Sequence, residues 1–346
     1  MADIAIRNEG RAGRITLTRP KALNALTYEM CLAVEKALLA WRGDKAVDLV
    51  ILDAEGDKAF CAGGDIAELY ATGKAGDYDY GRRFWRDEYR MNALIAEYGK
   101  PVVSFLQGFT MGGGVGLGCH GTHRIVDDAS RIAMPECGIG LVPDVGGSYL
   151  LARAPGRLGE YLGLTTDRMG PGAAIHAGFA DLYIPEGHWA DLTATLCRTG
   201  DVAALEAAAL TPPAPDWNVA AIDRLFAGEA LRDIVNALRS EDSDVARDAL
   251  GRMDKNAPLS MACTVEILHR LRAGTPTIRK ALELEFRFTA RAVEHGDILE
   301  GIRAAIIDKD RNPSWKHSLD GVPAAEMSRM LQPLPDEGLR FHEKEG

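Results

Sequence analysis

Two glycine-bearing stretches decide the fold: Lys58-Ala-Phe-Cys-Ala-Gly-Gly-Asp-Ile66 and Gly108-Phe-Thr-Met-Gly-Gly-Gly-Val-Gly-Leu-Gly118. Each follows a short apolar run that predicts a buried strand, over residues 49–53 and 102–107. Glycines after a strand let the backbone turn sharply and leave amide groups uncovered by side chains. Amides from two such loops could converge on one oxygen, which is how an oxyanion hole is made from backbone. A single Gly-Gly is usually only a turn, but two clusters favour a functional site.

The sequence around these loops alternates between strand and helix patterns. Ile4–Arg7 and Arg14–Thr18 alternate apolar and polar residues on either side of a glycine, which predicts a hairpin. Thr27 is placed as the N-cap of a helix whose apolar residues recur at helical spacing as far as Trp41. Weaker strand candidates follow at 125–126 and 132–133. This alternation favours an α/β layer architecture.

The pattern changes near residue 200, and a turn-rich segment, Thr211-Pro-Pro-Ala-Pro-Asp216, marks the break. Beyond it nearly every segment has helical spacing. Asp297 with Glu300 resembles a capping box at the start of the last of these helices. We therefore predict a core over 1–200 and a helical region over 201–346 that covers the site. The predicted helices span 220–226, 231–238, 259–271, 278–294 and 298–307.

Composition narrows the class of protein. The chain has 346 residues, 47% of them hydrophobic, and a formal net charge of −10, which disfavours nonspecific nucleic-acid binding. Its six cysteines form no Cys-x-x-Cys pair, and no apolar run is long enough for a signal peptide or a membrane span. We expect a cytoplasmic protein with reduced thiols and neither a nucleic-acid nor a membrane partner.

Two acids stand in an otherwise apolar, glycine- and proline-rich segment, at Glu136 and Asp144. Asp144 could simply cap a helix running to about Arg153. If both acids are buried, desolvation raises their pKa values and suits them to the role of base, acid or nucleophile. The residues alone leave these two interpretations equally open.

Glu88 is a third acid in an unusual position. It falls at helical spacing with Phe84, Met91 and Ile95, so it lies on the apolar stripe of its helix. A carboxylate there needs a partner or a ligand. An ion pair with Arg82, Arg83 or Arg124 is slightly favoured over a functional role.

Other motifs are weak or missing. The stretch Gly116-Leu-Gly-Cys-His-Gly121 fits G-x-G-x-x-G, but no strand runs directly into it, which argues against a dinucleotide site. His120 and His123 are expected to be structural rather than metal ligands. The sequence contains neither the G-x-S-x-G motif of hydrolases nor a P-loop.

Arg19-Pro-Lys-Ala-Leu-Asn-Ala25, Phe60-Cys-Ala-Gly-Gly-Asp-Ile66 and Met111-Gly-Gly-Gly114 resemble the enoyl-CoA hydratase/isomerase (crotonase) superfamily. The resemblance implies a spiral of repeated strand–strand–helix units, followed by helices that cover an acyl-CoA site. The chain is more similar still to the hydrolases of that superfamily that cleave 3-hydroxyisobutyryl-CoA. The segments that carry this closer resemblance are Gly108–Gly118, Met134-Pro-Glu136, Pro143-Asp-Val-Gly-Gly147, Ile306-Ile-Asp-Lys-Asp310 and Pro313-Ser-Trp-Lys316.

The resemblance also implies roles for individual residues. Gly64 and Gly113 would supply the oxyanion amides to the thioester carbonyl. Glu136 and Asp144 would form the working pair, and Glu88 would lie near the acyl end of the substrate. The remaining substrate-binding residues implied are Lys21, Ala22 and Leu23, along the adenine and pantetheine of CoA, together with Gly63, Asp65 and Ile66.

One departure separates the chain from the hydratases of the superfamily. They carry a second glutamate shortly after the triple glycine, and that position is Gly116 here. The resemblance therefore implies hydrolysis of a short 3-hydroxyacyl-CoA, as in valine breakdown. Alternatives are hydration or isomerisation of an enoyl-CoA on the same scaffold, and a binding protein without activity. No metal or redox cofactor is expected, because CoA is part of the substrate, and a homo-oligomer is possible.

Overall fold

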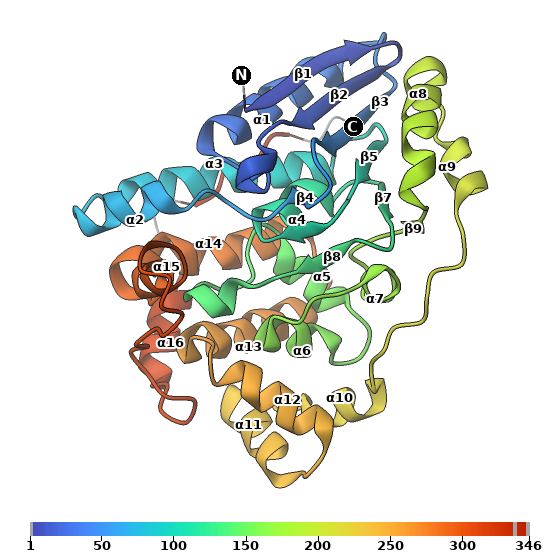
Figure 1. The fold of residues 1–346 in the computed structure, drawn as a ribbon. Coiled ribbons are helices and arrows are strands. Elements are labelled where there is room, and N and C mark those ends of the chain that lie inside the picture. The colour runs from blue at the N-terminus through green and yellow to red at the C-terminus, as the bar shows by residue number, and fades with distance from the viewer. Residues whose placement is uncertain (1–2, 335–337, 344–346) are drawn as a thin grey trace.

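The computed structural model describes residues 3–334 and 338–343, and its strands form two sheets (Figure 1). The larger has six strands in the order β1-β2-β3-β5-β7-β9, and the smaller has three in the order β4-β6-β8. Only the β1–β2 pair is antiparallel. The strands are β1 (Ile4–Glu9), β2 (Ala12–Leu17), β3 (Leu49–Ala54), β4 (Ala59–Cys61), β5 (Val102–Phe105), β6 (Phe109–Met111), β7 (His123–Val126), β8 (Arg131–Ala133) and β9 (Leu182–Tyr183).

Helices follow the strands and make up the rest of the regular structure. The first half of the chain contains α1 (Tyr28–Arg42), α2 (Ala67–Lys74), α3 (Asp79–Ala96), α4 (Gly113–Gly118), α5 (Gly147–Arg153), α6 (Leu158–Thr165), α7 (Pro171–His176) and α8 (Trp189–Thr199), with 3₁₀ turns η1 (Pro20–Ala22), η2 (Glu136–Ile139) and η3 (Glu186–His188). The second half contains α9 (Ala203–Ala208), α10 (Val219–Leu225), α11 (Leu231–Ser240), α12 (Asp244–Met253), α13 (Pro258–Arg272), α14 (Ile278–His295), α15 (Ile298–Ile302), the π turn η4 (Arg303–Ile307) and α16 (Ala324–Leu331).

A repeated unit underlies the two sheets. Three successive strand pairs, β3–β4, β5–β6 and β7–β8, each give their first strand to the larger sheet and their second to the smaller one. A helical segment follows each pair. The strand–strand–helix spiral implied by the resemblance is therefore present, and the predicted strands at 125–126 and 132–133 fall within its third unit.

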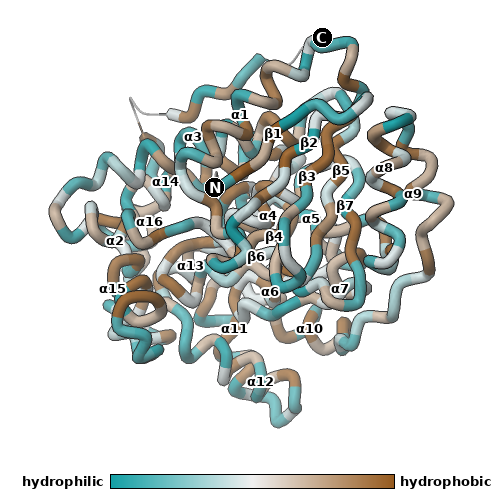
Figure 2. The backbone as a smooth tube through the Cα atoms, turned by 45° about the horizontal axis from the view of Figure 1, so that its top comes forward, coloured by the Kyte–Doolittle hydropathy of each residue, from teal (hydrophilic) through white to brown (hydrophobic). Residues whose placement is uncertain are grey.

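The larger sheet is buried on both faces, which explains why the sequence of β3 begins with four consecutive apolar residues. Val50 and Leu52 pack with α1 and α3 on one face. Leu49 and Ile51 pack on the other face with α8, whose Leu196 is fully buried. Hydrophobic segments accordingly run through the strands at the centre of the molecule (Figure 2).

Helix α1 begins as its sequence predicts. The Thr27 hydroxyl accepts a hydrogen bond from the Met30 amide at 3.2 Å. An N-cap of this kind satisfies an amide that the first turn leaves unpaired and contributes about 1 kcal/mol. The predicted hairpin at the N-terminus is also confirmed, with Ile4 opposite Leu17.

From residue 201 on, the regular elements in the described part of the chain are helices, as the sequence predicts. Helix α14 packs against α3 and α5, and α13 packs against α5 and α6, so these two long helices lie directly on the core (Figure 1). The boundary at residue 200 stays a prediction.

One local expectation in this half is wrong. Asp297 does not cap α15 with its side chain, because its Oδ1 accepts a hydrogen bond from the Lys316 amide at 3.1 Å. The helix predicted over 298–307 is confirmed, and it consists of α15 followed by the π turn η4. In the described part of the chain, no helix has both the length and the apolar character needed to cross a membrane.

Candidate active site

The two glycine loops come together at the ends of β4 and β6. These strands are neighbours in the smaller sheet, so the loops that follow them lie side by side. A Cβ built on Gly113 would lie 3.2 Å from the Gly64 amide nitrogen and 3.5 Å from the Gly63 carbonyl carbon. Gly112 has φ +51°, a left-handed conformation that favours glycine.

The backbone on either side determines where the two amides point. A parallel bridge joins Leu26 to Gly64, through the Leu26 amide to the Gly63 carbonyl and the Asp65 amide to the Leu26 carbonyl. In such a bridge the Gly64 amide points to the opposite side. Gly113 is the first residue of α4, and an amide there has no acceptor within the helix. The bridge therefore does not use the Gly64 amide, and α4 does not use the Gly113 amide.

The segment predicted to contact CoA is tied to this site. The Ala62 amide donates to the Leu23 carbonyl at 3.0 Å, so the end of η1 sits beside the first glycine loop. Arg19 forms an ion pair with Asp65 at 3.0 Å, which fixes the start of the same segment. Lys21 lines a cavity of about 240 Å³ together with Lys58. The end of this segment at Leu23 therefore lies beside the first glycine loop, although the two are far apart in sequence.

Glu136 and Glu88 meet the glycine loops from two directions. Both are only 4% exposed. A Cβ on Gly112 would lie 2.7 Å from Glu136 Oε1, and a Cβ on Gly113 would lie 3.1 Å from Glu88 Oε1. Each carboxylate thus lies against the backbone of the triple-glycine loop. Among the described residues, Glu136 Oε2 has no hydrogen-bond partner.

The ion pair expected for Glu88 is not present with two of its three candidates. Arg82 pairs with Asp79 and Glu294, and Arg124 pairs with Asp181. Burial and the nearby Asp144 raise the pKa of Glu88 well above its usual range. Glu88 therefore lies at the site as a buried acid that neither Arg82 nor Arg124 neutralises.

Asp144 joins this group from the loop between η2 and α5. It is 4% exposed and accepts a hydrogen bond from the Tyr89 hydroxyl at 2.7 Å. Its side chain does not cap α5, because the N-cap position is Gly146 and no side chain caps that helix. Burial raises the pKa of Asp144 to about 7, against the opposing effect of the Tyr89 hydrogen bond. Burial and Asp144 together raise the pKa of Glu136 well above its usual range.

A fourth buried acid, Glu285 on α14, holds the Asp144 loop. Its carboxylate accepts from the Gly146 amide at 2.9 Å, from the Ser148 amide at 3.1 Å and from the Ser148 hydroxyl. Val145, which lies between Asp144 and Gly146, has φ +52°, a conformation that costs energy in a β-branched residue. Burial raises the pKa of Glu285 to about 8, although its three hydrogen bonds oppose the shift.

Tyr89 and Glu285 are not among the residues that the sequence predicts at the site. Both could have been suspected from helical spacing: Glu285 falls on the buried stripe of α14 with Leu282 and Phe288, as Glu88 does on α3. Neither partner could have been assigned, because Tyr89 and Asp144 are separated by 55 residues and Gly146 and Glu285 by 139.

His120 supports the same loop from outside. Its Nε2 lies 2.8 Å from the Val145 carbonyl, and burial lowers its pKa to about 4. His123 contacts the Thr122 hydroxyl. Across the ranges that the structure describes, no cluster of His, Cys, Asp and Glu is arranged to hold a metal ion.

Gly116 leaves no room for a side chain. A Cβ there would lie 2.6 Å from Val145 Cβ and 2.8 Å from Asn92 Nδ2. Contacts under about 3 Å force neighbouring atoms to shift, and Val145 is held in place by the Glu285 contacts. A glutamate at this position would not fit the present packing.

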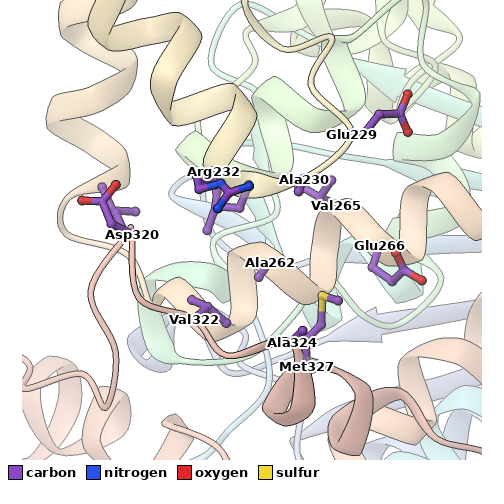
Figure 3. Close-up of a pocket in the computed structure, with 12 residues that line it drawn as sticks. Glu229, Ala230, Arg232, Ala262, Val265, Glu266, Asp320, Val322, Ala324 and Met327 are labelled. Carbon is purple, nitrogen blue, oxygen red and sulfur yellow. The ribbon is translucent and has the colours of Figure 1, made fainter.

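A separate cavity of about 270 Å³ lies between α11, α13 and the segment 319–327 (Figure 3). Its lining is mainly apolar, and Figure 3 shows Arg232 and Asp320 at its edge. It includes none of the acids or glycines described above, so it is not part of the candidate active site.

Comparison with known proteins assigns the class. The model of the enoyl-CoA hydratase/isomerase family matches residues 12–331, and the chain belongs to this family. A solved enoyl-CoA hydratase from Rhodobacter sphaeroides 2.4.1 is 55% identical with a TM-score of 0.93, over 98% of this chain and 100% of that one. A solved carnitinyl-CoA dehydratase from Mycobacterium thermoresistibile is 39% identical with a TM-score of 0.93, over 99% of each chain.

Curated relatives point to one enzyme within this family. The mitochondrial 3-hydroxyisobutyryl-CoA hydrolases of Gallus gallus and Danio rerio are 34% and 36% identical over 98% of this chain, and over 91% and 92% of their own lengths. The resemblance to these hydrolases and the crotonase-like fold expected from the sequence are confirmed. The cytoplasmic location is wrong: the vertebrate relatives are named as mitochondrial proteins.

Proposed function

We propose that this chain hydrolyses the thioester of 3-hydroxyisobutyryl-CoA and releases CoA and the 3-hydroxy acid, a step of valine breakdown. Curated relatives with this name cover nearly the whole chain. The observation that carries the proposal is the placement of Glu136, whose Oε1 lies against Gly112. The next residue, Gly113, is the one to which we assign an oxyanion amide. A carboxylate beside an oxyanion hole is the arrangement that acyl transfer requires.

The first task of the site is to polarise the carbonyl. The thioester oxygen accepts hydrogen bonds from the amides of Gly64 and Gly113, and attack on the carbonyl carbon moves negative charge onto that oxygen. Fixed donors stabilise this charge in a site shielded from water, and losing one donor typically costs ~10²–10³ in rate. The rest of the substrate lies along Lys21, Ala22 and Leu23, with Gly63, Asp65 and Ile66 beside the thioester.

Glu136 then acts in one of two ways. Either it attacks the carbonyl carbon, the C–S bond breaks, CoA leaves as a thiolate, and water opens the resulting anhydride, or it takes a proton from an attacking water. Both routes need the ionised carboxylate. Asp144 orients the substrate or carries the proton, and Glu88 lies at the acyl end. Neither route needs a metal or redox cofactor.

The test is thiol release from purified protein, followed with a colorimetric reagent. Racemic 3-hydroxyisobutyryl-CoA is compared with 3-hydroxypropionyl-CoA, acetyl-CoA and crotonyl-CoA. We expect fast release from the two 3-hydroxyacyl thioesters and little from the others. No release from any thioester, by protein with an intact circular dichroism spectrum, would refute the hydrolase proposal.

A second candidate is enoyl-CoA hydration, because the solved structure at 55% identity is that of an enoyl-CoA hydratase. The packing of Val145 and Asn92 against Gly116 argues against it, since a second glutamate has no space there. Loss of the conjugated absorbance of crotonyl-CoA faster than any thiol release would favour this reaction over hydrolysis.

A further inference from the structure

Asn92 lies on the same face of α3 as Glu88, one helical turn further on. Its side chain is fully buried. Among the described residues, neither its amide nitrogen nor its carbonyl oxygen has a hydrogen-bond partner. Buried side-chain amides are normally paired, so an unpaired one beside an active site points to a ligand.

The neighbours of Asn92 place it at the acyl end of the site. Glu88, four residues earlier, lies against Gly113, and Tyr89, three residues earlier, donates to Asp144. Asn92 Nδ2 lies 2.8 Å from the position that a Cβ on Gly116 would take. This face of α3 therefore follows the site from the oxyanion loop toward α4 and the Asp144 loop.

The spacing matches the length of the acyl group. Gly116 is three residues beyond Gly113, which corresponds to about 4.5 Å along α4. In a 3-hydroxyacyl thioester, the hydroxyl oxygen is three bonds from the carbonyl carbon, about 3.5–4 Å in an extended chain. The Gly113 amide points away from α4, so the carbonyl oxygen lies beyond the start of that helix. An acyl chain that turns back along α4 brings its hydroxyl short of the level of Gly116 and within one hydrogen-bond length of Asn92.

We propose that Asn92 binds the 3-hydroxyl of the acyl group and so sets the preference for 3-hydroxyacyl over unsubstituted acyl thioesters. A hydroxyl both accepts and donates, and a primary amide offers a donor and an acceptor in one plane. A substrate without the hydroxyl leaves the Asn92 amide buried and unpaired, which a site discriminates against strongly. The inference rests on the proposed hydrolase function.

The test compares 3-hydroxyisobutyryl-CoA with isobutyryl-CoA, which has the same carbon skeleton and lacks only the hydroxyl. Asn92→Leu keeps the approximate shape and removes both polar groups. We expect it to lower kcat/KM for the hydroxy substrate by about 10–100-fold and to leave the value for isobutyryl-CoA within about threefold. An unchanged ratio between the two substrates would overturn the proposal.

Ser104→Ala is the matched control. Ser104 on β5 is also fully buried, and its hydroxyl has no partner among the described residues, but it lies in the core sheet. Its removal should leave the substrate ratio unchanged. If Asn92→Leu does not fold, Asn92→Ser, which shortens the side chain, takes its place in the same comparison.

Binding measurements separate this proposal from the proposed function. If the wild-type protein cleaves no thioester, hydrolysis is refuted, and calorimetric titration with the same two thioesters then tests Asn92. We expect the wild type to bind the hydroxy compound at least about tenfold more tightly, and Asn92→Leu to bind both alike. Equal affinities in the wild type, or an unchanged preference in the variant, would refute the role of Asn92.

Discussion

The glycine loops and the Asp144 loop reach the same site, but they are held in different ways. Backbone hydrogen bonds between neighbouring segments fix the glycine loops, as in the bridge between Leu26 and Gly64. A single side chain from the helical half, Glu285, holds the Asp144 loop through three hydrogen bonds. The first arrangement resists side-chain substitution, whereas the second depends on one carboxylate. The strand-rich half thus supplies the groups to which we assign the reaction, and the helical half holds the loop that carries one of them.

The largest effect is expected at Glu136, within the strand-rich half. Glu136→Gln keeps the size of the side chain but cannot attack the carbonyl or accept a proton from water. We expect thiol release from 3-hydroxyisobutyryl-CoA to fall by at least ~10³. Retention of wild-type turnover by a folded variant would contradict the mechanism.

A smaller loss of activity is expected when the hydrogen bonds from Glu285 to the Asp144 loop are weakened. Glu285→Gln replaces an acceptor of three hydrogen bonds with a group that accepts fewer, so Asp144 shifts relative to the acyl group. A displacement of about 1 Å costs on the order of 10²-fold in rate, and we expect kcat to fall by about 10–100-fold with a smaller change in KM. Ser148→Ala removes only the hydroxyl donor and should cause a smaller loss in the same direction. Wild-type kcat in both variants would show that Glu285 has no positioning role.

Stability should respond to pH in the direction set by Asp144. Its pKa of about 7 in the folded state exceeds the ordinary value of 3.8, so between these pH values the folded protein keeps a proton that the unfolded chain has released. The contribution of Asp144 to the free energy of unfolding therefore falls as pH rises from about 4 to 7 and stays constant above pH 7. Asp144→Asn should raise the free energy of unfolding at pH 8 by ~1–4 kcal/mol, with the gain shrinking toward pH 4. Denaturant titrations at both pH values measure this, and an equal effect at the two would contradict the raised pKa.

The smallest effects concern the caps of one helix in each half. Thr27 caps α1 in the core, and Thr277 caps α14, the helix that carries Glu285. Replacing either by alanine should lower the free energy of unfolding by about 1 kcal/mol. Because Glu285 lies two turns inside α14, we expect kcat to change less than twofold in both variants. A large kcat loss in Thr277→Ala alone would show that the end of α14 also positions the site.

Sequence patterns predicted the parts of the molecule that depend on local spacing. The two strands before the glycine loops, the Thr27 cap and the long C-terminal helices follow from periodicity and capping chemistry. The apolar setting of Glu136 and Asp144 indicated burial, which the structure has. Their catalytic roles remain a proposal.

What sequence could not predict depends on contacts between distant segments. Asp297 has a capping pattern, yet its carboxylate accepts a hydrogen bond from the amide of Lys316, which lies 19 residues further on. Glu88 was slightly favoured as one half of an ion pair, but Arg82 and Arg124 have other acidic partners. Tyr89, Glu285 and Asn92 face the site only because α3 and α14 pack together on α5 and α4.

The buried acids around the glycine loops also bear on the release of the product. In the proposed reaction, the acyl end of the substrate enters as a neutral group, and hydrolysis converts it into an anion. That anion forms among Glu88, Glu136 and Asp144, which are each 4% exposed. Repulsion between like charges is strong where water is excluded. Each of these acids that is ionised therefore repels the product acid and favours its release.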